Sequence, residues 1–419
     1  MLKDNTIQVF EHSFLPIEGK FEQRHFVALS KLNALHQYQY FDLKHNGILF
    51  KQFVGVIQVD GLTIEILPKI DKYETENELA KQKWQRALIE MLRVTRKLKV
   101  QQVGEANVRK QQIHLLDIYF EWFLNEVQLL IHHGLIKQYY KETSNVKALK
   151  GKLEFAGHIS KNLVHKERFY TKHQVYDKDH LVHQVLNIAL TIVEKCTKGN
   201  YLYSKCKTVQ LDFPEVKSIH VNETTFTKLP NNRKTAPYET ALAIARLIIL
   251  NYAPNISSGN EKMLALLFDM NSLWEEYVLV RLKQSAKDDV RVYGQDSKPF
   301  WKNITIRPDI VIEKGEGDDK ETFIIDTKWK NIDYSEPSTQ DLRQMYVYNE
   351  YWDSKKAMLL YPSNETKEIK EGDFVPFENN KHACSLGKVS IFNKATETLN
   401  ENIGKEILGW FSAVEYKNS

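Results

Sequence analysis

The stretch Arg307–Lys330, RPDIVIEKGEGDDKETFIIDTKWK, decides the fold predicted for this part of the chain. Two runs rich in β-branched and aromatic residues, Ile304 to Glu313 and Thr322 to Trp329, are typical of buried strands. The segment between them, Lys314 to Glu321, is charged and contains glycine, as an exposed turn does. We therefore predict a β-hairpin here.

Three polar residues stand at the ends of these two runs. Asp309 opens the first apolar run, Asp326 closes the second, and Lys328 follows two positions later. Because side chains alternate along a strand, Asp326 and Lys328 share a face, and pairing of the hairpin can bring Asp309 to it. Two carboxylates suit Mg²⁺, and a lysine beside them can orient or deprotonate an attacking water, as phosphodiester hydrolysis requires. The structural alternative is a turn residue at 309 and a same-face ion pair between 326 and 328.

The composition is that of an ordinary water-soluble protein of several domains. The chain has 419 residues, of which 42% are hydrophobic and 27% charged, with a net charge of +4. Its three cysteines, Cys196, Cys206 and Cys384, have the spacing of neither a zinc site nor a disulfide framework, so we expect a reducing cytoplasm. We see no signal-peptide core and no apolar run of the ~20 residues that a membrane span needs.

The chain divides by pattern into three blocks, and we predict a mixed fold of the α/β (α+β) class. Residues 1–150 start with a β-rich module, in which Asp60-Gly61 is a hairpin signal, and continue into helices. Residues 151–254 form a mixed, largely helical connecting region. Residues 255–419 carry the candidate site, and a helix is expected there from Met263 to Leu282.

Two helices supply further polar residues near the hairpin. Glu275 and Glu276 lie on the expected helix before it, and either one can reach a metal if that helix packs beside the hairpin; otherwise both are solvated charges. Gln344 and Tyr348 are four residues apart on the helix after it, so they share a face.

Taken together, these motifs resemble the McrC family, the nuclease subunit of McrBC-type restriction systems specific for 5-methylcytosine, and the PD-(D/E)xK nuclease superfamily. No single motif is specific, but their order and co-occurrence are. The stretches that carry the resemblance are Gly61–Ile70, Gly151–Leu153, Glu167–Tyr170, Asp179, Asp269–Val278, Arg307–Asp309, Asp326–Lys328, and Gln344 with Tyr348.

The resemblance implies a C-terminal PD-(D/E)xK restriction-endonuclease-like α/β domain and a role for each site residue. Asp309 and Asp326, helped by the carbonyl of Thr327, would ligate Mg²⁺, and Lys328 would position the attacking water. Glu275 would be the acidic residue of the preceding helix. The residues implied to support the site or touch the DNA backbone are Gln344 and Tyr348.

The resemblance also implies partners. One is a hexameric ring of an McrB-like AAA+ GTPase, whose GTP hydrolysis this chain would stimulate, and the other is double-stranded DNA whose modified cytosine the ring would read. The chain has no G-x-x-x-x-G-K-[ST] motif, so it is not itself the motor. We expect residues 1 to about 150 to dock on the ring. The alternatives are a stand-alone PD-(D/E)xK restriction or repair nuclease and a non-enzymatic activator.

Overall fold

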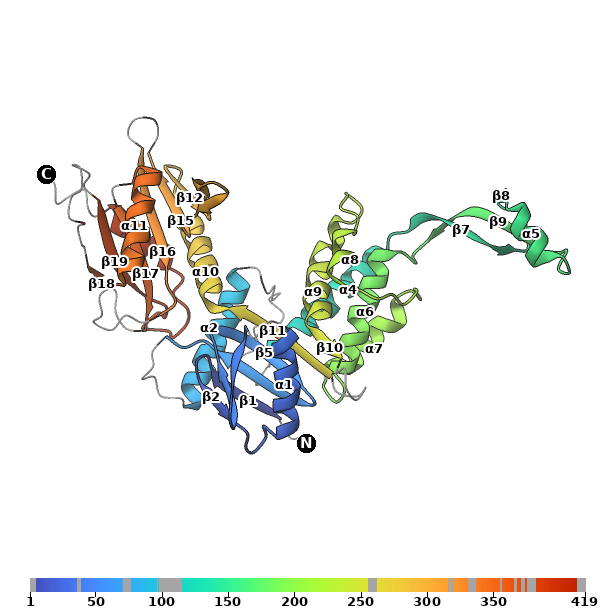
Figure 1. The fold of residues 1–419 in the computed structure, drawn as a ribbon, viewed down its shortest axis with the longest axis horizontal. Helices are drawn as coiled ribbons and strands as arrows, with labels where there is room; N and C mark the ends of the chain where they lie inside the picture. Colours follow the sequence, from blue (N-terminus) through green and yellow to red (C-terminus); the bar gives the residue numbers. More distant parts are fainter. Residues whose placement is uncertain are drawn as a thin grey trace. The chain divides into compact units, whose positions relative to one another are not determined.

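The computed structural model describes residues 5–35, 39–70, 77–95, 97, 115–254, 262–315, 317, 320–330, 337–354, 356–364, 368–370, 374 and 382–412. The chain forms two compact units, one of residues 1–4 and 110–266 and the other of residues 5–109 and 267–419. Helices and several sheets occur together, so the mixed α/β class is confirmed (Figure 1). In the described segments, no helix has both the length and the apolar character to cross a membrane.

This division differs from the three blocks predicted from sequence pattern, 1–150, 151–254 and 255–419. The reason is aromatic packing between segments far apart in the chain. Trp84 from the N-terminal part contacts Trp329, with ring centroids 6.3 Å apart, and Phe392, at 4.9 Å. All three side chains are buried, so the N-terminal module shares a core with the C-terminal domain.

The N-terminal module of residues 5–109 is β-rich, as expected, and its described part also contains helices. Its elements are β1 (Thr6–Phe10), β2 (Phe14–Pro16), α1 (Gln23–Leu35), β3 (Phe41–Lys44), β4 (Gly47–Phe50), β5 (Phe53–Val59), β6 (Leu62–Leu67) and α2 (Glu78–Val94). Strands β2, β4 and β3 form one small sheet, while β1 pairs in parallel with β6 and β6 pairs antiparallel with β5. Helix α1 was missed in the β-rich region; it buries Ala28, Leu29 and Leu32 on one face.

The tight turn between β5 and β6 confirms the Asp60-Gly61 hairpin signal. Both residues have positive φ, 46° at Asp60 and 79° at Gly61. Positive φ at both central positions is what a type I′ turn requires, and this turn matches the right-handed twist of the strands.

The C-terminal domain is built on a six-stranded sheet in the order β12-β15-β16-β17-β19-β18. The strands are β12 (Val290–Gly294), β15 (Ile310–Lys314), β16 (Glu321–Thr327), β17 (Lys356–Ser363), β18 (Glu368–Lys370) and β19 (Ala383–Ser390). Strands β16, β17 and β19 are parallel and the other pairs antiparallel. Helix α11 (Thr339–Trp352) connects β16 to β17, and α12 (Ile403–Ser412) follows the sheet.

The two faces of this sheet are covered differently. Val311, Ile324 and Leu359 form a buried cluster with Met345 and Trp352 of α11. On the other side, Phe323 packs against Phe411 of α12, with ring centroids 4.7 Å apart. Alternation along β15 and β16 therefore decides which side chains face α11.

The predicted first strand, Ile304 to Glu313, is wrong as a continuous element. It is interrupted at residues 307–309: Ile304–Ile306 forms β14, which pairs with β13 (Lys298–Trp301) in a separate two-stranded sheet, and β15 starts at Ile310. Pro308 lies in the interruption, where its missing N–H costs no ladder hydrogen bond. The second predicted strand, Thr322 to Trp329, is confirmed as β16, which ends two residues earlier, at Thr327.

The predicted helix from Met263 to Leu282 is wrong in its first turns. Lys262–Asp269 is a strand, β11, and the helix α10 (Met270–Ser285) begins only afterwards. The Asp269 side chain caps it by accepting a hydrogen bond from the Ser272 N–H at 3.0 Å. The apolar run before Asp269 is thus a strand, because a short apolar run fits a buried strand as well as a helix.

The other compact unit is mainly helical. It contains α4 (Leu115–His133), α6 (Leu181–Cys196), α7 (Leu202–Asp212), α8 (Glu223–Thr227), the 3₁₀ helix η2 (Ala236–Tyr238), α9 (Glu239–Leu250) and the short strand β10 (Tyr252–Pro254), which pairs with β11. A two-stranded arm projects from these helices: β7 (Gln138–Val146) pairs with β9 (Phe169–Asp177), and β8 (Lys152–Leu153) and α5 (Phe155–Asn162) lie at its far end (Figure 1).

Candidate active site

The hairpin of β15 and β16 brings Asp309 and Asp326 together. Ile310 is paired with Ile325, so the two aspartates occupy opposed positions at the end of the hairpin and share the face covered by α11. Thr327 ties the two strand ends together: its backbone N–H and its hydroxyl both donate to Asp309 Oδ2, at 2.7 Å and 2.9 Å.

Asp326 and Lys328 form an ion pair whose carboxylate is buried. Lys328 Nζ lies 2.6 Å from Asp326 Oδ2, and the Asp326 side chain is only 3% exposed. Burial raises the pKa of Asp326 to about 6, Asp309 adds to this, and Lys328 opposes it. Burial lowers the pKa of Lys328, but the charge and hydrogen bond of Asp326, together with the charges of Asp341 and Asp309, outweigh it, so the net direction is upward. Lys328 is therefore an ammonium at neutral pH.

Gln344 and Tyr348 reach the same carboxylate from α11. The Gln344 side-chain amide donates to Tyr348 Oη at 2.8 Å and to Asp326 Oδ1 at a longer 3.4 Å. The Tyr348 hydroxyl in turn donates to the Arg307 carbonyl oxygen at 2.8 Å. This chain of contacts fixes the backbone just before Asp309 relative to Asp326.

The geometry distinguishes the two neighbouring glutamates of α10. Burial raises the pKa of Glu275, and the charge of Asp309 raises it further, so this carboxylate belongs to the acidic site. Gln295 holds it by donating from Nε2 to Glu275 Oε1 at 2.8 Å, while its own backbone N–H donates to the Asp309 carbonyl at 2.9 Å. Glu276 instead pairs with Lys97 of the N-terminal module, at 2.9 Å.

Sequence reasoning missed Asp341, a further carboxylate beside the lysine. Asp341 Oδ1 lies 3.7 Å from Lys328 Nζ, and its other oxygen lies 3.5 Å from Lys330 Nζ. The only signal in the sequence is the first turn of α11: Ser338 caps the helix by accepting from the Asp341 N–H at 3.1 Å. Gln295 was missed as well, because nothing local in the sequence relates it to Glu275.

The donor set fits a cation that needs few protein ligands. Among the described residues, no group of three or more His, Cys, Asp or Glu side chains could hold a metal ion. Asp309, Asp326 and the Thr327 carbonyl remain, and Mg²⁺ keeps several waters and binds through one or two carboxylates. Asp326 Oδ2 supports this fit: it is buried, and apart from the Lys328 ion pair no described group donates a regular hydrogen bond to it.

Comparisons of sequence and structure with known proteins agree on one family. A family model described as "McrBC 5-methylcytosine restriction system component" matches residues 48–362, about three quarters of the chain. The type IV methyl-directed restriction enzyme EcoKMcrBC of Escherichia coli K12 is 23% identical over 296 residues, which cover 64% of this chain and 82% of that protein.

Solved structures from Thermococcus gammatolerans share the fold. One is a half-complex from a tetradecameric assembly of McrB AAA+ hexamers with bound McrC; the match has a TM-score of 0.70 and 18% identity, over 98% of this chain and 100% of that chain. The other is an McrBC complex, with a TM-score of 0.50 and 20% identity over 67% of this chain and 88% of that chain.

Proposed function

The chain belongs to the McrBC 5-methylcytosine restriction system component family, and from this premise we propose that it is the endonuclease subunit, which cleaves DNA phosphodiester bonds with Mg²⁺ held by Asp309, Asp326 and the Thr327 carbonyl. The observation that carries this proposal is the pair of opposed aspartates, of which Asp326 is buried and has an ammonium 2.6 Å away. A PD-(D/E)xK nuclease needs these groups in this arrangement.

Each protein group has a distinct task in this proposal. Bound Mg²⁺ would supply the Lewis acidity that polarises the phosphate. Lys328 holds its proton, because its pKa is raised, so it orients the attacking water and faces the negative charge that develops on the phosphate. Gln344 and Tyr348 hold Asp326 and the backbone at Arg307 in place, so they are positioning residues. Glu275 completes the acidic site through Gln295.

We propose that cleavage also requires a ring of an McrB-like AAA+ GTPase, which reads the modified cytosine and brings the DNA. The test uses plasmid DNA carrying methylated cytosine, Mg²⁺, GTP, the purified chain and the purified ring. We expect cutting only when all components are present, and loss of cutting in EDTA. Robust cutting by the chain and Mg²⁺ alone would favour a stand-alone nuclease. Stimulation of GTP turnover without any cutting would favour a non-enzymatic activator.

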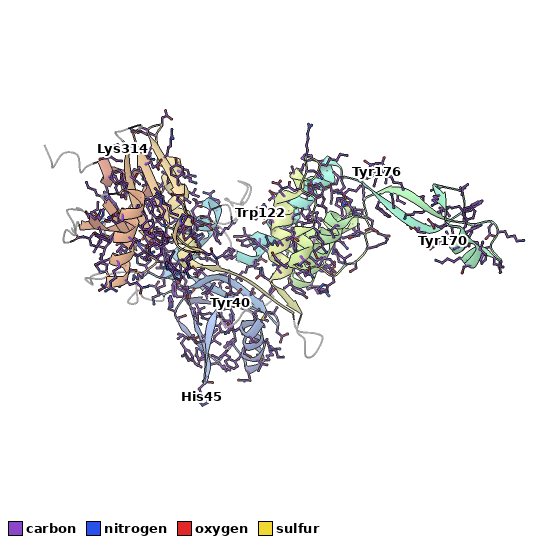
Figure 2. All side chains as sticks on the ribbon, turned by 45° about the horizontal axis from the view of Figure 1, so that its top comes forward. Tyr40, His45, Trp122, Tyr170, Tyr176 and Lys314 are labelled. Atoms are coloured by element: carbon purple, nitrogen blue, oxygen red, sulfur yellow. The ribbon has the colours of Figure 1, made fainter. Side chains whose placement is uncertain are left out.

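The arm is the surface best suited to dock on that ring. Seven large apolar side chains on residues 138–177 are exposed, and a packed domain rarely leaves such a cluster open to water. They are Tyr139, Leu149, Phe155, Ile159, Leu163, Val164 and Tyr176. Figure 2 shows Tyr170 near the far end of the arm and Tyr176 nearer the helices. This proposal moves the docking region from residues 1–150, expected from sequence, to an arm that spans position 150.

Val164 and Leu163 offer a direct test of docking, because they are 84% and 73% exposed. Replacing both with aspartate leaves the core of the arm intact but removes two of the exposed apolar side chains at its far end. We expect this variant to lose stimulation of the ring's GTP turnover, while a variant with Asp309→Ala and Asp326→Ala stimulates like the parent. If the arm variant stimulates the ring's GTP turnover as fully as the parent, the N-terminal module and not the arm is the docking site.

A further inference from the structure

A small hairpin next to the site has no role in the chemistry described so far. Strands β13 and β14 form a two-stranded sheet of their own, outside the six-stranded sheet, and turn at Lys302, whose φ is +48°. Three large apolar side chains near the turn are exposed: Phe300 (45%), Trp301 (58%) and Ile304 (54%). A two-stranded hairpin cannot bury such side chains by itself, so they are open to a partner.

The base of the hairpin is fastened to α11, the helix that carries Gln344 and Tyr348. The Trp352 indole N–H donates to Asp296 Oδ2 at 2.7 Å, and Lys298 Nζ donates to the Tyr351 carbonyl at 2.7 Å. Lys298 Nζ also lies 4.8 Å from the centre of the Trp352 ring, and Phe300 packs on Tyr351 with ring centroids 5.5 Å apart. These contacts with α11 therefore fix the position of the hairpin that carries the exposed turn.

The hairpin leads directly into the candidate site. From Trp301 to Asp309 the chain runs through eight residues, which span at most about 29 Å when fully extended. That is less than one turn of a DNA duplex, about 34 Å. A duplex whose phosphate lies at Asp309 and Asp326 is thus within reach of the turn.

The charge at the turn matches a nucleic acid. Lys302 is exposed, and its Nζ lies 4.8 Å from the centre of the Trp301 ring. Arg307, between the hairpin and Asp309, is exposed as well. The acidic residue at the base, Asp296, already accepts from Trp352. Lysines neutralise phosphates, and aromatic side chains stack on bases or wedge into the minor groove.

We propose that the β13–β14 hairpin is a DNA-gripping element, in which Lys302 contacts a backbone phosphate and Trp301 packs against the bases or sugars beside the bond to be cut. This inference rests on the proposed nuclease function and adds to it a substrate-contacting surface. Its occupant is duplex DNA. A protein partner at the same surface is the competing outcome that the test must separate.

The test measures the affinity of the full-length chain for a short DNA duplex in EDTA, where no metal-dependent cleavage takes place. We expect Trp301→Ala to weaken binding about tenfold, the size of effect that one stacked ring provides, and Trp301→Phe to restore most of it. Lys302→Ala should reduce the slope of log affinity against log salt by about one, because one phosphate contact is lost.

Matched controls lie elsewhere on the molecule. Leu211→Ala removes another exposed apolar side chain, 86% exposed, and Lys314→Ala removes a positive charge at the opposite end of β15, labelled in Figure 2. Both controls should bind DNA like the parent. Thermal unfolding of every variant verifies that the fold is kept.

The outcomes separate this inference from the proposed function. Hairpin variants that bind DNA like the parent overturn the inference, whether or not the parent cleaves. If the hairpin variants bind DNA more weakly than the parent and the parent itself never cleaves DNA, the DNA-binding role of the hairpin is supported and the proposed nuclease function is contradicted. Unchanged DNA affinity together with lost stimulation of the ring's GTP turnover would assign the hairpin to a protein partner and overturn the inference.

Discussion

A buried carboxyl group links the N-terminal module to the residue that follows Lys328, and it yields a quantitative prediction. Glu11 is 1% exposed. Its Oε1 accepts hydrogen bonds from the Lys69 backbone N–H at 2.8 Å and from the Trp329 indole N–H at 2.7 Å. Its Oε2 is buried without a hydrogen-bond donor among the described residues, and His12 Nε2 lies 3.8 Å away.

The cost of ionising Glu11 follows from its pKa. Burial raises this pKa from 4.5 to about 8; the bonds from Lys69 and Trp329 oppose the change, and the charge of Asp269 adds to it. A shift of this size corresponds to roughly 5 kcal/mol, at 1.36 kcal/mol for each pKa unit. The folded protein holds one more proton than the unfolded chain between about pH 4.5 and 8. The contribution of Glu11 to the free energy of unfolding is therefore fully present below pH 4.5 and is lost as the pH rises through about 8.

The variant Glu11→Gln removes the titration and keeps an acceptor oxygen for Lys69 and Trp329. We expect its free energy of unfolding to match that of the parent at about pH 5 and to exceed it progressively toward about pH 8.5, with a ceiling of roughly 5 kcal/mol. Urea unfolding of both proteins across this range measures the difference. Glu18→Gln, which removes an exposed carboxylate, is the matched control. A difference between Glu11→Gln and the parent that does not change with pH would refute the reasoning.

Two further variants test neighbouring parts of the site. Lys328→Ala should lose DNA cleavage and keep Mg²⁺ binding, because an ammonium is not a ligand for a cation. Calorimetric titration with Mg²⁺ measures the binding. A loss of binding as large as that of Asp326→Asn would show that the lysine is structural. Trp352→Phe removes the indole N–H that donates to Asp296 and should lower the free energy of unfolding by about 1–3 kcal/mol. Thermal unfolding measures this. If the variant unfolds at the same temperature as the parent, the bond contributes nothing to stability.

Much of the site could be predicted because its geometry is local. The alternation of side chains along a hairpin was enough to place Asp309, Asp326 and Lys328 on one face, and four-residue spacing placed Gln344 and Tyr348 together on one helix. These relations depend only on the regular geometry of strands and helices.

Other parts depend on contacts between distant segments, which no local pattern encodes. Neighbouring glutamates at 275 and 276 are equivalent in sequence, and Lys97, from the N-terminal module, pairs with one of them. Glu11 meets Trp329 across 318 positions of the chain, so its burial could not be foreseen. The strand at Lys262–Asp269 was mistaken for helix because its apolar residues are too few to show a period.

The central claim is that Asp326 holds the catalytic metal at the end of the β15–β16 hairpin. The most direct measurement compares DNA cleavage by the parent and by Asp326→Asn, each assembled with the GTPase ring at equal GTP turnover and supplied with Mg²⁺. Asparagine is nearly the same size and removes one negative charge, so the fold and the docking to the ring should remain. We predict that Asp326→Asn abolishes cleavage, and cleavage at the parental rate would contradict the account.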